Sequence, residues 1–418
     1  MIKLLFSFSL IMFCFGVDGQ DTIQQKVLGR KNDISQLDKP YVILISADGF
    51  RYDYADKYRA ENLIKLRKSG AKAKSMIPSY PSVTFPNHYT IATGMYPAHH
   101  GLVYNQFYDR ARKQSYAMNV RTTVEDGSWY GGTPLWVLAE QQGMLSASYH
   151  FVGTEAAIKQ TLPSYWYKFD DNTNINYRID KVVEWLTLPA ETRPHFISFY
   201  MSNADHEGHK HGPEAKETQE AVQFVDKAVQ SLVEKVNLLG LPVNFVFVSD
   251  HGMANVDTIA RINIASMIDT SRFIIKGGGT SLHLYAKDTS DILITYNLLK
   301  SKEKDFTVYL RNDIPAKWNY ATSNDRYNRI GDLLVVPHFP KVLSSWSGRI
   351  SPGAHGFDPA IKEMHATFYA WGPQVKKGKT IPAFENVHIY PFIARILGLT
   401  YTEKIDGNPK VLNHLIKK

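Results

Sequence analysis

The sequence predicts an α/β fold, with an open, mainly parallel central sheet, helices on both faces and a smaller inserted or edge subdomain. Continuous apolar runs recur with helical stretches between them, which is typical of buried parallel strands and their crossover helices. One stretch, from about Asn255 to Ser345, breaks this regularity. A chain of 418 residues with 44% hydrophobic and 21% charged residues is long enough for one large domain or for a core with a subdomain.

Four strand-and-helix repeats make up the regular part of the chain. The first expected strand is the run YVILISA, residues 41–47, and the helix after it, residues 60–70, ends at Gly70, a common helix stop. Such repeats indicate a parallel sheet covered on both faces. The other expected elements are helix 134–143, strand 144–151, strand 195–202, helix 218–240, strand 242–250, antiparallel strands in 274–287 and 329–339, strand 365–371 and a closing helix, 386–398.

The first nineteen residues have the pattern of a cleaved secretory signal peptide. Lys3 precedes an apolar run from Leu4 to Val17, and the small residue Gly19 follows. A membrane anchor is the alternative, but the run is shorter than the roughly 20 residues that a spanning helix needs. We therefore expect an exported protein, periplasmic or secreted, with no membrane span after cleavage. Residues 20–418 would form a single domain, with about 255–345 as its subdomain.

The cysteine count and the charge restrict the chemistry further. Cys14 is the only cysteine and lies inside the expected signal peptide, so a metal site would have to use carboxylate, imidazole or hydroxyl ligands. The formal net charge is +8, and the sequence contains no run of five or more residues of like charge. Specific nucleic-acid binding is therefore not expected, whereas attraction of small anionic substrates is. The oligomeric state is left open.

Acidic and imidazole side chains follow the expected strands, where ligands bind in open α/β sheets. Three aspartates and three histidines of this kind suit two divalent zinc ions. Each alone is compatible with a turn or a helix cap, and the neighbouring His206, Glu207 and His211 leave the choice of ligand open in one loop. The six candidates are Asp48, Asp205, His209, Asp250, His251 and His355.

Thr84 lies in the stretch YPSVTFPNHY, residues 80–89, directly before an expected helix. A threonine hydroxyl is a poor nucleophile unless a base or a metal activates it. At a helix N-terminus, backbone N–H groups and the helix dipole favour an anion. The alternative is that Thr84 only caps the helix.

Together, these motifs resemble the nucleotide pyrophosphatase/phosphodiesterase family of the alkaline phosphatase superfamily. The similarity runs from about Tyr41 to Gly398 and includes ADGFRYDY, PSYPSVTFPNHYTIATG, DHEGHKHGP, SDHGM and HGFD. It implies a single alkaline phosphatase-like catalytic domain. This chain departs from the family pattern at Asn203 and Ala204, where Glu-Pro is common, and at Phe151, where Trp is usual.

The resemblance also implies roles for individual residues. Thr84 would be the nucleophile, and Asn105 would bind a non-bridging phosphoryl oxygen. Phe85 and Tyr200 would contact the substrate, and Trp166 or Tyr167, beside Tyr165, would stack on its base. One zinc would be held by Asp48, Thr84, Asp250 and His251, and the other by Asp205, His209 and His355.

The lead hypothesis is an exported two-zinc enzyme that hydrolyses nucleotide phosphodiester or pyrophosphate bonds to nucleoside monophosphates through a phospho-threonine. The matching motifs contain no Arg or Lys aimed at the phosphoryl oxygens, which favours diesters over doubly charged monoesters. A phosphomonoesterase and a phospholipase C-like choline-headgroup phosphodiesterase are the alternatives within this chemistry. A non-catalytic zinc-stabilised anion-binding protein is the remote alternative.

Overall fold

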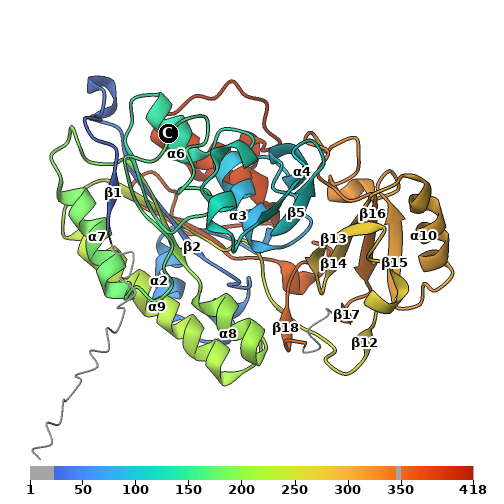
Figure 1. The fold of residues 1–418 in the computed structure, drawn as a ribbon. Coiled ribbons are helices and arrows are strands. Elements are labelled where there is room, and N and C mark those ends of the chain that lie inside the picture. Colours follow the sequence, from blue (N-terminus) through green and yellow to red (C-terminus); the bar gives the residue numbers. More distant parts are fainter. Residues whose placement is uncertain (1–22, 345–349, 418) are drawn as a thin grey trace, which may run out of the picture.

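The central layer is a nine-stranded mixed sheet, seen in the computed structural model, which describes residues 23–344 and 350–417 (Figure 1). Its strand order is β1-β8-β7-β9-β2-β10-β19-β3-β20. Strand β19 is antiparallel to both neighbours and β1 is antiparallel to β8, whereas the other neighbouring strands are parallel. The strands are β1 (Gln25–Lys26), β2 (Tyr41–Ala47), β3 (Ala71–Ala73), β7 (Ser146–Tyr149), β8 (Tyr165–Tyr167), β9 (Phe196–Met201), β10 (Val243–Val248), β19 (Phe368–Trp371) and β20 (Lys379–Ile381).

Both faces of this sheet are covered by helices, which confirms the predicted fold class. Alternate residues of β2 point to opposite cores: Val42 and Leu44 pack in one hydrophobic cluster, and Ile43 and Ile45 in the other. Helices of the first cluster are α3 (Thr84–Thr93), α6 (Leu135–Gln141) and α11 (Ile389–Leu397), and those of the second are α2 (Glu61–Ser69), α7 (Ile175–Thr187) and α9 (Lys216–Asn237). Figure 1 shows α7 and α9 on one side of β2 and α3 and α6 on the other.

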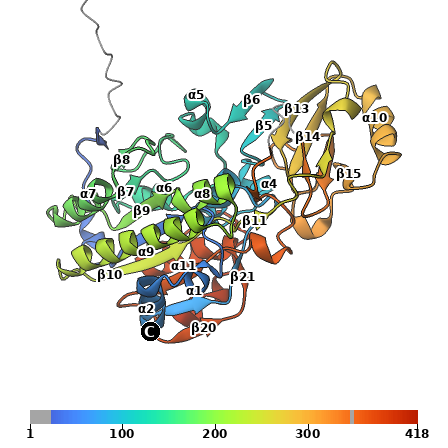
Figure 2. The same cartoon turned by 90° about the horizontal axis from the view of Figure 1, so that it is seen from below.

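A second, antiparallel sheet lies at one end of the molecule, away from α7 and α9 (Figure 2). Its order is β13-β14-β16-β15, and it has a hydrophobic cluster of its own that includes Leu284, Leu299 and Val308. The expected antiparallel strands of the irregular stretch are thus present, while the limits 255–345 stay a prediction. Its elements are β13 (Phe273–Gly278), β14 (Ser281–Ala286), α10 (Ser290–Lys300), β15 (Phe306–Leu310) and β16 (Leu333–Pro337).

Short strand pairs connect the two sheets and bring distant segments to the end of β10. Strand β11 follows β10 and pairs with β18, just before His355. This pairing places His355 beside the carboxyl end of the central sheet. The remaining helices and strands are α1 (Tyr54–Lys57), β4 (Met76–Ile77), α4 (Pro97–His100), β5 (Gln106–Asp109), β6 (Gln114–Ala117), α5 (Arg121–Val124), α8 (Asn203–His211), β11 (Ala254–Asn255), β12 (Arg261–Ile262), β17 (Val342–Leu343), β18 (Gly353–Ala354) and β21 (Phe384–Glu385).

Two expectations about the N-terminus stay predictions. The expected signal peptide, residues 1–19, lies outside the described residues. Among the helices of residues 23–344 and 350–417, none is both long and apolar enough to cross a membrane.

Candidate active site

Two of the predicted acidic residues end neighbouring parallel strands. Asp48 follows β2, and Asp250 follows β10 after one residue. Gly49 lets the chain turn tightly here, with a φ of +66°, and a Cβ on it would meet Asp205 Cα at 2.8 Å. Its backbone N–H also donates to Asp250 Oδ1 at 3.3 Å. Glycine at this position therefore allows α8, which carries Asp205, to approach the strand ends.

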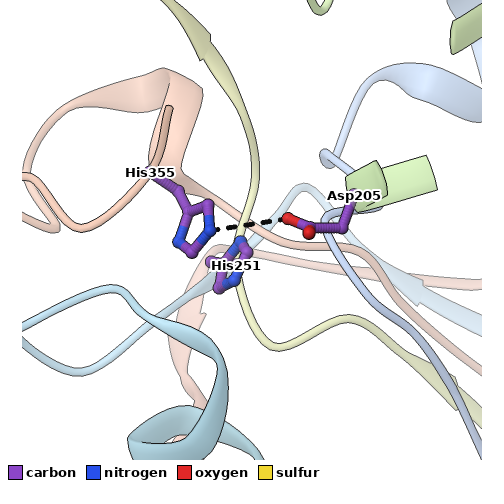
Figure 3. Close-up of side chains that lie close together, drawn as sticks. All are labelled: Asp205, His251 and His355. Carbon is purple, nitrogen blue, oxygen red and sulfur yellow. Dashed lines mark ion pairs between the residues drawn. The ribbon is translucent and has the colours of Figure 1, made fainter. Parts of the chain in front are cut away.

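Asp205 and His209 both belong to α8, four residues apart, so they lie on one face of a helix. The imidazole of His355 completes this group from the other side. Asp205 Oδ1 lies 3.5 Å from His209 Nε2 and 3.5 Å from His355 Nε2, and the two Nε2 atoms are 2.9 Å apart. Figure 3 shows Asp205, His251 and His355 pointing at one another.

The other group is centred on His251, which is fully buried. Its Nε2 lies 3.0 Å from Asp250 Oδ2, 3.5 Å from Asp48 Oδ1 and 3.3 Å from Thr84 Oγ1. The structure thus brings together the predicted residues from β2, α3 and β10. Asp48, Asp250 and His251 offer ligand atoms within 4.8 Å of one another, and so do Asp205, His251 and His355.

Hydrogen bonds fix how the three imidazoles present their nitrogens. In each ring Nδ1 faces a backbone carbonyl, and only a protonated nitrogen can donate to it. We therefore assign the proton to Nδ1, which leaves the lone pair on Nε2 directed into the site, the arrangement that metal-ligating histidines share. The three contacts, each 2.9 Å long, are His209 to Gly353, His251 to Gly252 and His355 to Ser82.

The site contains more acceptors than donors. Within the described residues, Asp48 Oδ1, Asp205 Oδ1 and Asp250 Oδ2 are buried and have no hydrogen-bond partner. Burial and the carboxylates of Asp250 and Asp205 raise the pKa of Asp48 well above its ordinary value. Burial and the imidazoles of His251 and His209 lower the pKa of His355. Facing lone pairs and orphaned carboxylate oxygens fit divalent cations, since each atom is a ligand without a proton.

His206, Glu207 and His211 were the alternative ligand candidates near Asp205 and His209, and their side chains lie outside the ligand cluster. The side chain of His206 is 64% exposed, and His211 Nε2 lies 3.3 Å from Glu207 Oε2. These three side chains form surface contacts on α8. The helix geometry therefore favours the pair Asp205 and His209 as the ligands.

Thr84 is the first residue of α3, as the sequence predicts for a residue at a helix N-terminus. The cap position itself is occupied by Val83, whose side chain cannot accept a hydrogen bond. The loop before Thr84 is held by Asn87, which is fully buried. The Asn87 amide accepts from Ser79 N at 2.7 Å and donates to Pro81 O at 2.8 Å and to Val83 O at 2.9 Å. These hydrogen bonds tie the loop before Thr84 to helix α3 and thereby fix the position of the Thr84 hydroxyl.

A hydrogen bond to Phe85, the residue after Thr84, holds Asn105 near Thr84. Asn105 Oδ1 accepts from the backbone N–H of Phe85 at 2.9 Å. This bond fixes the orientation of the amide and leaves its Nδ2 protons without a partner among the described residues. The amide is therefore available to an anion at the start of α3.

A pocket of about 430 Å³ opens beside Thr84 and Asp48. Most of the exposed surface of its wall is apolar, although charged and polar side chains also border it. Tyr200 joins the pocket to the ligand cluster, because its hydroxyl donates to Asp48 Oδ2 at 2.7 Å. The other lining residues are Phe85, Met118, Asn119, Arg121, Val124, His150, Phe151, Val152, Gly153, Glu155, Phe169 and Asp205.

Trp166 and Tyr167, expected to stack on a substrate base, do not line this pocket. Both lie in β8, where successive side chains point to opposite faces. The ring of Tyr167 is buried and stacks on Tyr149, with centroids 4.5 Å apart. Phe151 and Phe169 line the pocket instead, and neither was among the residues predicted for the site. The sequence feature that could have indicated these pocket residues is the fragment HFVGTEA, which contains Phe151 and Glu155.

His88 is a further residue of the site that the sequence did not single out. It is fully buried, and its Nδ1 lies 3.0 Å from Thr84 O and 3.2 Å from Asp250 Oδ2. Its Nε2 is 2.8 Å from Ser46 Oγ. His88 thus connects the first turn of α3 to a carboxylate of the ligand cluster.

Known proteins share sequence with most of this chain. The model of the type I phosphodiesterase / nucleotide pyrophosphatase family matches residues 42–358. The venom phosphodiesterase CdcPDE of Crotalus durissus collilineatus is 32% identical over 388 residues, which are 90% of this chain and 46% of that protein. Ectonucleotide pyrophosphatase/phosphodiesterase family member 1 of Mus musculus is 30% identical over 397 residues, 92% of this chain and 43% of that protein. The chain spans about half the length of the curated relatives it matches.

Solved structures show the same architecture. Murine ectonucleotide pyrophosphatase/phosphodiesterase 5 superposes with a TM-score of 0.85 at 25% sequence identity, over 90% of this chain and 100% of that one. The human protein of the same name superposes with a TM-score of 0.84 at 25% identity, again over 90% of this chain and 100% of that one. The alkaline phosphatase-like fold expected from the sequence is thereby confirmed.

Proposed function

Because the chain belongs to the type I phosphodiesterase / nucleotide pyrophosphatase family, we propose that it is a zinc-dependent hydrolase that cleaves nucleotide phosphodiester or pyrophosphate bonds and releases nucleoside monophosphates. The observation that carries this proposal is the position of Thr84. Its hydroxyl lies 3.3 Å from His251 Nε2, beside orphaned carboxylate oxygens and at the mouth of an apolar pocket.

Two zinc ions suit the oxygen and nitrogen donors of the site. When bound, zinc would make the Thr84 alkoxide available near neutral pH and would offset the charge of the phosphoryl oxygens, as it lowers the pKa of bound water to about 7. The residues proposed to hold one ion are Asp48, Thr84, Asp250 and His251, and those for the other are Asp205, His209 and His355.

The chain's own residues then position the reactants. Thr84 Oγ1 attacks phosphorus and loses its proton to solvent, while the bond from phosphorus to the leaving oxygen breaks and its electron pair leaves with that oxygen. Water then hydrolyses the phospho-threonine, which releases the nucleoside monophosphate and restores the Thr84 hydroxyl. The Asn105 amide, held by Phe85 N, donates to a non-bridging oxygen at the positive end of α3. Phe85, Phe169 and Tyr200 supply ring faces beside the site for the base of a nucleotide.

The charge around the pocket supports diesters over monoesters. Arg121 is the cation of the pocket wall, and it lies 3.1 Å from Glu125 and 3.9 Å from Glu155. Its charge is shared with these carboxylates rather than directed at Thr84. A doubly charged monoester would need a guanidinium directed at its phosphoryl oxygens, and the guanidinium of Arg121 contacts Glu125 and Glu155 instead. A singly charged diester carries less charge and does not need this partner.

A choline-headgroup phosphodiesterase is the second candidate, and the pocket wall gives the reason. Phe151, Phe169 and Tyr200 surround a space that Glu155 also borders. Aromatic rings next to a carboxylate can hold a quaternary ammonium. The test below therefore includes a choline ester.

Export is also part of the proposal. Residues 1–19 have the pattern of a signal peptide. The matched relatives are named as venom enzymes or ectoenzymes, which supports secretion of this chain.

The direct test compares three chromogenic substrates on the zinc-loaded protein: the p-nitrophenyl ester of thymidine monophosphate, p-nitrophenyl phosphate and p-nitrophenyl phosphocholine. We expect the nucleotide ester to have the highest kcat/KM. Thr84→Ala should lower kcat by more than about 1000-fold while bound zinc, measured by atomic emission, stays nearly unchanged. Thr84→Ser, which keeps the hydroxyl, is the matched control and should retain activity. Normal turnover by Thr84→Ala would refute the assignment of the nucleophile.

A further inference from the structure

The end of the central sheet at β20 is strongly basic. Strand β20 is the outermost strand at this end and pairs with β3, which follows α2 after Gly70. Residues 61–79 and 373–381 contain these elements and carry eight Lys or Arg and one acidic residue, Glu61. Their net charge is therefore +7, whereas that of the whole chain is +8. The positive charge of the protein is thus concentrated at one end of its sheet.

Six lysines of these segments have no partner for their charge. Arg67 is different, because its Nη1 donates to Asp56 Oδ2 at 2.9 Å. Lys376 Nζ donates to His414 O at 2.8 Å. The remaining lysine side chains make no hydrogen bond or ion pair within residues 23–344 and 350–417, and all of them are exposed except Lys72, which is half-buried. We name these six lysines the basic edge: Lys65, Lys68, Lys72, Lys74, Lys377 and Lys379.

The fold brings the two segments of the basic edge together. In the register of β20 and β3, the residue after Lys379 lies opposite Lys72. Neighbouring strands are about 4.8 Å apart, so these two lysines start from adjacent points of the sheet. The hydrogen bond from Arg67 lowers the pKa of Asp56, and the charges of Lys72 and Lys68 lower it further. Lys68 of α2 and Lys72 of β3 therefore lie near one carboxylate, and the basic edge is a continuous surface.

Protection of an open sheet edge accounts for only part of this charge. Lysines on an edge strand hinder the pairing of a strand from another chain, and this role suits Lys379 in β20 and Lys377 just before it. It does not apply to Lys65 and Lys68, which belong to a helix, or to Lys72, whose strand is paired on both sides. The charge on the helix and on the inner strand therefore requires another explanation.

The basic edge lies far from the pocket beside Thr84. That pocket is lined by Arg121 and Val124 of α5 and by His150, which follows β7. Figure 2 shows α2 and β20 on one side of the molecule and α5 on the opposite side. A surface bound at the basic edge would therefore leave the pocket open to solvent.

We propose that the basic edge docks the protein on an anionic lipid surface. Clusters of about four to eight Lys or Arg are typical of protein surfaces that bind anionic lipid headgroups. A nucleic acid carries the same sign of charge. However, the exposed large apolar side chains of the described chain all lie outside residues 61–79 and 373–381, so no exposed aromatic ring is available to stack on bases. The inference goes beyond the proposed function, because docking places the protein without taking part in hydrolysis.

The test measures how the purified protein sediments with lipid vesicles. We expect binding to vesicles that contain phosphatidylglycerol, weaker binding to vesicles of phosphatidylcholine alone, and a smaller difference at high salt. The double variant Lys72→Gln, Lys379→Gln should weaken binding to the anionic vesicles by about 10–30-fold. Arg at both positions should preserve binding, because the charge is kept. The matched control is Lys302→Gln with Lys304→Gln, which should change binding less than about threefold. Both control lysines follow α10, are exposed and have no side-chain partner among the described residues.

Several results would overturn the docking surface. They are equal binding to the two kinds of vesicle, equal losses in the edge variant and its control, and a loss in the Arg variant as large as in the Gln variant. Unchanged vesicle binding by the Gln variant, together with weaker binding of a duplex oligonucleotide, would assign the basic edge to nucleic acid and overturn the proposal as well. Without vesicles, kcat/KM for the thymidylate ester should be the same in every variant, which keeps this test separate from that of the proposed function.

Discussion

Tyr200→Phe should weaken metal binding although the ring stays in place. The Tyr200 hydroxyl donates to Asp48 Oδ2 at 2.7 Å, and the side chain is 8% exposed. Burial and the charge of Asp48 raise the pKa of this phenol well above its ordinary value, so the group remains a donor throughout the working range. A hydrogen bond to a charged acceptor contributes about 1.5–3 kcal/mol, which corresponds to roughly 10–150-fold in an equilibrium constant.

The assay is zinc affinity by competition with a chromophoric chelator, together with kcat and KM for the thymidylate ester. We expect an affinity loss within that range and a KM that changes less than about threefold, because the ring face is retained. Tyr89→Phe is the control, since its buried hydroxyl has no hydrogen-bond partner among the described residues. A large rise in KM with unchanged zinc affinity would show that Tyr200 acts on the substrate rather than through Asp48.

Two further changes test the framework around the site. Asn87→Ala removes the hydrogen bonds to Ser79, Pro81 and Val83 and leaves these backbone groups buried without their side-chain partner. The free energy of unfolding, measured in urea, should therefore fall by about 2–4 kcal/mol, and kcat should fall because Thr84 is less well positioned. An unaltered unfolding midpoint would contradict this. Burial lowers the pKa of His100 from 6.5 to about 3, so the unfolded chain binds the extra proton first, and stability rises with pH between these values. His100→Gln should reduce that slope, measured by denaturation between pH 4.5 and 6.5. The reduction should be about 1.4 kcal/mol per pH unit at the acidic end of this range and about half of that at pH 6.5. An unchanged slope would mean that His100 is not buried as a neutral group.

The sequence predicted the central strands because their burial is visible in composition. Every residue of β2, β9 and β10 is buried, so each strand is apolar except for one residue, Ser46, Ser198 and Asn244 respectively. Strand direction is not encoded in the same way. β19 is as apolar as its neighbours, yet it is antiparallel to β10 and β3, because its direction depends on the path of the chain through the second sheet.

The sequence predicted which acidic and imidazole side chains lie together at the strand ends, but it did not predict the residues that line the pocket, and the difference has a physical reason. Asp48 and Asp250 are placed by the strands they end, and Asp205 and His209 by the period of one helix. The pocket rings depend on irregular backbone. His150 has a φ of +64°, a conformation that is uncommon for a residue other than glycine, and it precedes Phe151. No periodic pattern predicts the direction of a side chain after such a residue.

The cluster of candidate ligands has an arrangement of charges that a bound cation would stabilise. Asp48 and Asp250 are buried, as is one carboxylate oxygen of Asp205, and burial together with the carboxylates of Asp250 and Asp205 raises the pKa of Asp48. His355 Nε2 and His209 Nε2 face each other at 2.9 Å, and both Nδ1 protons are already donated to Ser82 and Gly353. Neither ring can turn to relieve this contact without losing a hydrogen bond. Protonation or a cation would neutralise the site, and a cation would do so while leaving each Nε2 lone pair available as a ligand. The same close contacts between carboxylates and imidazoles surround the Thr84 hydroxyl, which is the group that we propose attacks the substrate.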